Sequence, residues 1–92
     1  MALSFEWHEA KAAANLKKHG ISFEEAQTVF HDPLALTIDD PKHSQDEQRF
    51  IDIGYSTQGR LLVVAYTERG ETIRIISSRR ATKSERSAYE NV

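Results

Sequence analysis

The chain opens with the alternation of hydrophobic and polar residues that is typical of a short strand. Its hydrophobic positions are Leu3, Phe5 and Trp7, each separated by one polar residue, and a period of two indicates a strand with one buried face. Residues 8–19 are instead rich in Ala, Lys and Glu and stop at Gly20, the residue that most often ends a helix. The first twenty residues therefore predict a strand followed by an amphipathic helix.

A second helix is predicted directly afterwards. Residues 22–25 fit a capping box, in which the Ser22 hydroxyl accepts a hydrogen bond from a backbone N–H and Glu25 reaches back to the Ser22 N–H. Pro33 disfavours the helical conformation in the residue before it, so the helix should end before Asp32. Its buried face is expected to consist of Phe23, Ala26, Val29 and Phe30.

After Pro33 the period returns to two. One strand is predicted around residues 34–38, an exposed polar loop at 39–46, and a second capping box at 82–85 opens a last helix that runs to about Asn91. Between them, short turns at 57–59 and 69–70 favour an antiparallel meander of three strands, Arg49 to Tyr55, Leu61 to Thr67 and Glu71 to Ser77.

The order β-α-α-β-β-β-β-α predicts a single α+β domain over residues 1–92. We expect an antiparallel sheet with two N-terminal helices and one C-terminal helix, all packed on one face. A chain of this length can build only one modest core. It has no cysteine, which excludes a disulfide framework or a thiolate nucleophile, and the N-terminus lacks the features of a signal peptide. We expect a soluble, cytoplasmic protein.

The charge is unevenly distributed along the chain. Although the formal net charge is -2, residues 60–92 contain seven basic and four acidic residues. A basic surface on a nearly neutral chain favours a defined anion site, such as a site for a few phosphates, over general coating of nucleic acid. Alternation places Arg74 on the face opposite the buried Ile73 and Ile75, and we expect Asp52 to share that face with it. A functional role for Arg74 and a purely structural ion pair are equally open interpretations.

Arg79 and Arg80 lie where the last strand ends and the last helix begins. Free backbone N–H groups and the positive end of the helix dipole attract phosphate at such a junction, and the planar fork of arginine grips phosphate oxygens in pairs. The alternative is that both residues only solvate a turn and pair with Glu85.

The four histidines do not have the spacing of a metal site. His8, His19, His31 and His43 form neither H-x-x-x-H nor H-E-x-x-H, so we expect no metal cofactor. His19 follows Lys18 at a helix end, where the carbonyl dipoles favour protonation. It is a candidate for proton transfer, with a partly buried capping histidine as the alternative and His43 as a second candidate.

Several segments together resemble the BrnT family of ribonuclease toxins of type II toxin–antitoxin modules. The resemblance extends over essentially the whole chain. It is carried by Phe5 to Lys11, Asn15 to Ala26, Val29 to Pro33, the 40–43 loop, Glu47 to Gly54, and Ile73 to Ala81 with Glu85 and Tyr89.

This resemblance implies a RelE-like fold, RNA cleavage that blocks translation, and neutralisation by a BrnA-type antitoxin that carries a DNA-binding domain. Operator DNA would be bound only through the antitoxin, in a hetero-oligomer of the two proteins. RNA cleavage without a metal needs a base for the ribose 2′-OH, cations around the phosphorane and an acid for the 5′ oxygen.

The roles that we assign are hypotheses. Arg74 and Arg79 hold the scissile phosphate, and Arg49 adds a third cation. Lys18 or His19 transfers protons, because clustered positive charge can lower the pKa of a lysine. Tyr89 stacks on a base or donates a proton, with core packing as an equal alternative. Further contacts to RNA are expected from Arg80, Lys83 and Arg60.

One other function is compatible with the residues, and a second is disfavoured. A non-catalytic module could use the basic surface to bind RNA or an acidic protein without cleavage. A DNA-binding repressor that acts alone is disfavoured, because the net charge is -2 and no basic recognition helix is evident.

Overall fold

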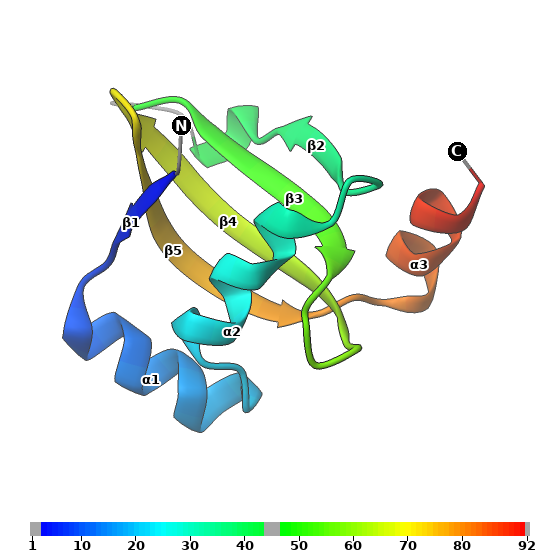
Figure 1. Ribbon diagram of the computed structural model, residues 1–92, viewed down its shortest axis with the longest axis horizontal. Helices are drawn as coiled ribbons and strands as arrows, with labels where there is room; N and C mark the ends of the chain where they lie inside the picture. Colours follow the sequence, from blue (N-terminus) through cyan, green and yellow to red (C-terminus); the bar gives the residue numbers. More distant parts are fainter. Residues whose placement is uncertain (1–2, 44–46, 92) are drawn as a thin grey trace.

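A five-stranded sheet with the order β1-β5-β4-β3-β2 organises the protein (Figure 1). The computed structural model describes residues 3–43 and 47–91. Three strands form the predicted antiparallel meander, and β2 continues it at one edge. The strands are β1 (Ser4–Glu6), β2 (Leu36–Asp39), β3 (Arg49–Tyr55), β4 (Leu61–Arg69) and β5 (Thr72–Arg80).

The sheet is mixed, which corrects the prediction of a wholly antiparallel one. β1 pairs in parallel with β5, with Phe5 opposite Ile73. The alternation of residues 3–7 predicts a strand but carries no information about its direction in the sheet. That direction depends on the pairing of β1 with β5, which are far apart along the chain.

The predicted helices are present. The helical elements are α1 (Glu9–His19), α2 (Phe23–Gln27), η1 (Thr28–His31), η2 (Pro41–His43) and α3 (Lys83–Glu90). The 3-10 turn η1 continues the second predicted helix, and the 3-10 turn η2 lies within the predicted polar loop. Gly20 ends α1 with a φ of 70°, a conformation that glycine adopts without steric penalty. Thr82 and Glu85 form the complete capping box predicted for α3. Within residues 3–43 and 47–91, no helix combines the length and the apolar character needed to cross a membrane.

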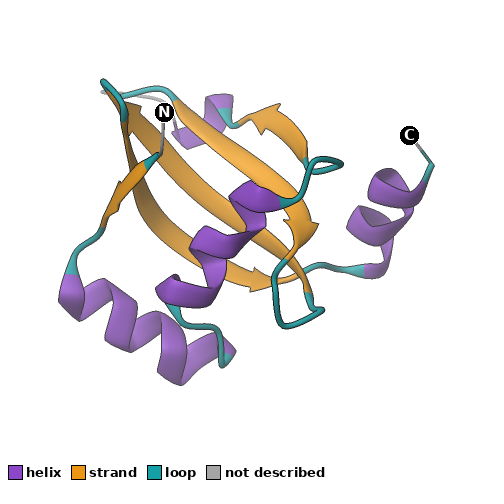
Figure 2. Ribbon diagram, viewed as in Figure 1, coloured by secondary structure: helices purple, strands orange, loops and turns teal. Residues whose placement is uncertain are grey.

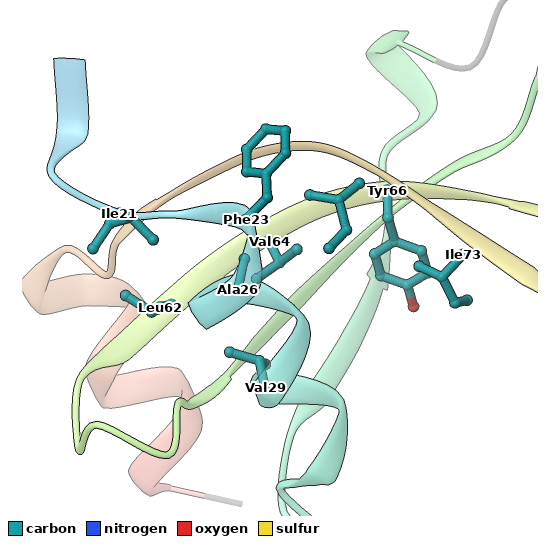
Figure 3. Packing of buried hydrophobic residues seen from close by; sticks show 9 residues of the cluster. Ile21, Phe23, Ala26, Val29, Leu62, Val64, Tyr66 and Ile73 are labelled. Carbon is teal, nitrogen blue, oxygen red and sulfur yellow. The ribbon is translucent and has the colours of Figure 1, made fainter. Parts of the chain in front are cut away.

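The main core lies between one face of the sheet and the two N-terminal helices. Figure 3 shows Phe23, Ala26 and Val29 in one cluster with Leu62 and Val64 of β4. Each of these five side chains has 0% exposure. The core prediction for the second helix is thus confirmed for its three buried positions, and Phe30 packs against the same cluster while only partly buried.

The opposite face of the sheet carries a smaller cluster of Ile53, Leu61 and Val63. Tyr89 of α3 packs against this cluster, and Figure 2 shows α3 set apart from the two N-terminal helices. The prediction that all helices share one face is therefore wrong for α3. A capping box predicts where a helix begins, but not the side of the sheet to which it returns.

Asn15 is a buried polar residue that ties α1 to the sheet. It is 8% exposed, and its side-chain amide donates to the carbonyls of Ile21 and Ser78, both at 2.9 Å. Its Oδ1 accepts from the backbone N–H of Ser78 at 3.0 Å. One side chain therefore satisfies three backbone groups that would otherwise be buried without partners.

Glu25 is also buried, and it departs from the capping box predicted at 22–25. The Ser22 hydroxyl accepts from the Glu25 N–H as predicted, but the Glu25 carboxylate does not contact Ser22. It accepts from Arg60 Nε at 2.9 Å and from Ser56 Oγ at 2.7 Å, and it forms an ion pair with Arg60 Nη2. Glu25 is 3% exposed, and an ion pair with Arg60 offsets the cost of burying its charge better than a further hydrogen bond from a backbone N–H would.

Substitution of Asn15 by alanine should destabilise the fold without changing the face of the sheet opposite α1. We expect Asn15→Ala to lower the free energy of unfolding by about 3 kcal/mol, because it leaves buried backbone groups unpaired. Urea unfolding measures this. Lys17→Ala, at an exposed position of the same helix, is the control and should change it by less than about 0.5 kcal/mol. Equal effects of the two substitutions would contradict the role of Asn15.

Candidate active site on the arginine face

Three of the arginines predicted to act on RNA share the face of the sheet opposite α1 and α2. Arg49 of β3 and Arg74 of β5 both pair with Thr67 of β4. Arg79 pairs with Val63, which lies on the same side of β4 as Thr67. We call this surface the arginine face.

A β-bulge places Arg79 there. Arg74 and Arg79 are five residues apart, so strict alternation would direct them to opposite faces. The β4–β5 register shifts between Ala65 and Tyr66: Tyr66 pairs with Ile75, whereas Ala65 pairs with Ser77. The intervening residue has no partner in this register, and the residues after it change sides. Unbroken alternation would also direct Ser77 away from Arg74, whereas the bulge brings both residues to one face.

The arginine face is hollowed next to Arg79. The hollow has a volume of ≈ 280 Å³ and combines two guanidinium groups with an apolar floor. Its lining residues are Asp40, Arg49, Ile51, Val63, Ala65, Ser77 and Arg79. Arg74 lies on the same face but does not line the hollow. The structure thus brings together Arg49 and Arg79 from separate strands, with Arg74 beside them.

Carboxylates orient two of these arginines. Glu85 of α3 accepts two hydrogen bonds from Arg79, at 2.7 and 2.8 Å, and one from the Thr82 N–H. The hydrogen bond from Arg79 is the main cause that lowers the pKa of Glu85 to about 2, and the same contact raises the pKa of Arg79. Arg74 donates to Glu6 at 2.6 Å.

Lys18 and His19 lie in the helical layer. They end α1, which Asn15 holds against Ser78 on the face opposite Arg79. The sheet therefore separates both candidates for proton transfer from the hollow. The side chain of His43 and residues 44–46 lie outside the described residues.

The three residues predicted to extend the RNA contact do not form one surface. Arg60 is bound to the buried Glu25. Arg80 is exposed and opposes Leu62, on the helix-covered face, where it helps to lower the pKa of Glu25 after the larger effect of the Arg60 hydrogen bond. Lys83 is exposed at the start of α3.

Tyr89 anchors α3 to the rest of the chain. Its hydroxyl donates to Asp32 Oδ2 at 2.7 Å, which raises the pKa of Tyr89 to about 12. Its ring meets Tyr55 edge-on, with the centroids 5.4 Å apart. Asp32 also accepts from the Tyr55 N–H at 2.8 Å. These contacts favour the packing role that the sequence left open for Tyr89.

Asp52 does not share the arginine face. It pairs with Val64 and lies in the helix-covered half of the structure, 5% exposed. Burial raises its pKa, against the opposing effect of hydrogen bonds from Thr37 and Tyr66, both at 2.8 Å to Oδ1. The prediction that Asp52 meets Arg74 is wrong, because alternation in β3 directs Ile51 and Ile53 to the face of Arg74.

The site contains residues that sequence reasoning missed. Asp40, Ser77 and Thr67 carry no recognisable motif. Strand register places Ser77 and Thr67 beside the arginines, and the backbone N–H of Asp40 donates to the Arg49 carbonyl at 3.0 Å. Among the described residues, no group of three His, Asp or Glu side chains is arranged to hold a metal ion.

Comparison with known families decides which family this is. The model of the family described as ribonuclease toxin, BrnT, of type II toxin–antitoxin system matches residues 7–85. The chain belongs to this family. The resemblance seen in the sequence is thereby confirmed, and with it the assignment to ribonuclease toxins of type II toxin–antitoxin systems.

A solved structure supports the BrnT assignment at the level of fold. The crystal structure of the Brucella abortus ribonuclease toxin, BrnT, aligns with a TM-score of 0.69 and 21% sequence identity. The alignment covers 89% of this chain and 100% of that one. No curated protein shows significant similarity.

The Arg79–Glu85 pair should make the stability of this BrnT-family chain sensitive to acid. The folded pKa of Glu85, about 2, lies below the ordinary value of 4.5. Its ionised form therefore stabilises the fold fully above about pH 4.5, and this contribution disappears as the pH falls toward about 2.

Glu85→Gln should remove that part of the acid dependence. We expect the melting temperatures of the variant and the wild type to differ most near neutral pH and to converge near about pH 2. Glu90→Gln is the control, because Glu90 forms an exposed, long ion pair with Arg86 at 4.0 Å. If the melting temperatures of Glu85→Gln and wild type differ by a constant amount down to about pH 2, the Arg79–Glu85 pair is not the source of the acid sensitivity.

Proposed function

We propose that this chain is a metal-independent endoribonuclease toxin that cleaves RNA in the cytoplasm and thereby inhibits translation. The observation that carries this proposal is the hollow of the arginine face, where Arg49 and Arg79 from separate strands line one concave surface. Such a surface suits a phosphodiester, because arginine binds phosphate oxygens in pairs and the apolar floor reduces screening by water.

The proposed reaction transfers the phosphoryl group from the 5′ oxygen to the adjacent ribose 2′ oxygen. The ribose 2′-OH attacks the adjacent phosphorus and loses its proton, the P–O5′ bond breaks, and the 5′ oxygen takes up a proton. The products are a 2′,3′-cyclic phosphate and a 5′-hydroxyl end. Negative charge accumulates on the phosphoryl oxygens in the transition state, and Arg49 and Arg79 are placed to stabilise it.

Glu85 has a positioning role in this proposal. Its two hydrogen bonds to Arg79 fix the guanidinium at the wall of the hollow before RNA arrives, so less orientational freedom is lost on binding. Because Glu85 also completes the cap of α3, the end of the sheet and the start of this helix are held as one unit. Arg74 contributes a further cation on the same face.

We assign the proton acceptor to Asp40, which lines the same hollow as the two arginines. Lys18 and His19 lie across the sheet, so a role for them in proton transfer requires RNA to pass around the edge of the sheet. Arg80 and Lys83 are exposed cations that attract RNA over a longer range.

We further propose that a BrnA-type antitoxin neutralises the toxin and that the complex contacts operator DNA only through the antitoxin. Membership of a type II toxin–antitoxin family supports a protein partner. Expression of the chain alone should arrest growth, and co-expression of the adjacent open reading frame should restore it.

Substitution of Arg79 tests the site. Arg79→Lys keeps the charge but loses the paired hydrogen bonds, so we expect RNA cleavage by the purified protein to fall by about 100-fold or more. Arg69→Lys is the matched control, because Arg69 is also a strand arginine bound to a glutamate, with hydrogen bonds of 2.8 and 2.9 Å to Glu47, and it does not line the hollow. Full activity of a folded Arg79→Lys protein would remove Arg79 from the mechanism.

The chemistry of the RNA ends separates cleavage from binding alone. The arginines of the arginine face would also suit a module that binds RNA without cutting it. Purified toxin without antitoxin is incubated with end-labelled RNA in the presence of a chelator. Fragments with cyclic or 3′-phosphate ends support the nuclease, and a gel shift without fragments supports the binding module.

A further inference from the structure

Thr67 is a buried hydroxyl residue on the arginine face. It is 2% exposed, and its Oγ1 has no hydrogen-bond partner within the described part of the chain. A buried hydroxyl without a partner destabilises a fold, whereas valine has nearly the same shape, prefers strands and has no polar atom to satisfy. The structure by itself gives no reason for threonine at this position.

The neighbours of Thr67 are cationic. In the sheet register it lies between Arg49 on β3 and Arg74 on β5. Two carboxylates lie close by. Glu6 accepts a hydrogen bond from Arg74 at 2.6 Å. The pKa of Glu47 is lowered mainly by its hydrogen bond from Arg69, and further by the charges of Arg74 and Arg49. A hydroxyl between two guanidinium groups is a donor set that matches phosphate oxygens.

We propose that Arg49, Thr67 and Arg74 form a second phosphate subsite, which holds the phosphodiester next to the scissile one in single-stranded RNA. This inference rests on the proposed function and deepens it. The subsite lies one pair of residues along β4 from Ala65 in the floor of the hollow, about 7 Å away. This is on the order of the separation of successive phosphates in an extended strand.

The ion pair of Arg74, the register partner of Thr67, with Glu6 can open to such a ligand. Arg74 is 30% exposed and its partner Glu6 is 40% exposed, so their ion pair is accessible to solvent and weak. A phosphate that competes with Glu6 draws the Arg74 guanidinium outward, and the Thr67 hydroxyl then donates to a phosphate oxygen.

Thr67→Val tests the subsite, because it removes the hydroxyl and keeps the shape. The probe is a fluorescein-labelled 2′-O-methyl decanucleotide of mixed sequence, which cannot be cleaved because its 2′ oxygens are blocked; affinity is measured by fluorescence anisotropy at low salt. We expect Thr67→Val to bind the probe about tenfold more weakly, as fits a lost hydrogen bond to a charged group, while its melting temperature equals or exceeds that of the wild type. Thr67→Ser, which retains a hydroxyl, should bind within about twofold of the wild type.

Ser78 provides the matched control. It is the other residue of the described chain with a buried hydroxyl that lacks a partner, at 0% exposure, but it lies on the helix-covered face. Ser78→Ala should leave RNA affinity unchanged. Should Thr67→Val not fold, Thr67→Ala serves as a second variant without the hydroxyl.

The outcomes separate this inference from the proposed function. A wild type that cleaves RNA, together with a folded Thr67→Val protein of wild-type affinity, overturns the subsite alone. A wild type that neither cleaves RNA nor binds the probe overturns both. Weaker binding by Thr67→Val and Ser78→Ala alike overturns the subsite, because the loss would then be a general effect on the fold.

Discussion

The register between β4 and β5 is the constraint on which the rest of this structure depends. β5 presents Ile73, Ile75 and Ser78 to the helical layer, although an unbroken strand cannot direct both Ile75 and Ser78 to one face. The β-bulge between them resolves this conflict. It completes the core and the contact with Asn15 on one side, and on the other side it delivers Ser77 and Arg79 to the face that already carries Arg74.

A chain with a net charge of -2 can still carry a surface rich in arginine. Several acidic residues are committed to structure: Glu25 is buried against Arg60, Asp32 accepts from Tyr89 and two backbone N–H groups, and Asp52 is enclosed with Tyr66. Their charges are directed into the fold or paired. What the arginine face presents is therefore set by local arrangement, not by the net charge of the chain.

The fold and the site are supported by different observations. The family match over residues 7–85 and the structural likeness to the Brucella abortus toxin establish the family and the architecture. The placement of Arg49 and Arg79 around a hollow comes from this chain's own register and is the physical basis for proposing a nuclease site there. A fold of this kind provides a platform, and the chemistry follows from the side chains that the platform brings together.

The sequence by itself determined the elements whose causes are local. The period of two predicted the strands, Gly20 and Pro33 marked helix ends, and the capping residues at 22 and 82 marked helix starts, because each of these signals acts within a few residues. The sequence also singled out the arginines of the last strand. It could not determine the direction of β1, the face that α3 covers or the partner of Glu25, since each depends on residues distant along the chain. Only the tertiary structure decided that Arg74 and Arg79 share a face, because one unpaired residue in β5 reverses the alternation, and that Lys18 and His19 lie across the sheet from them.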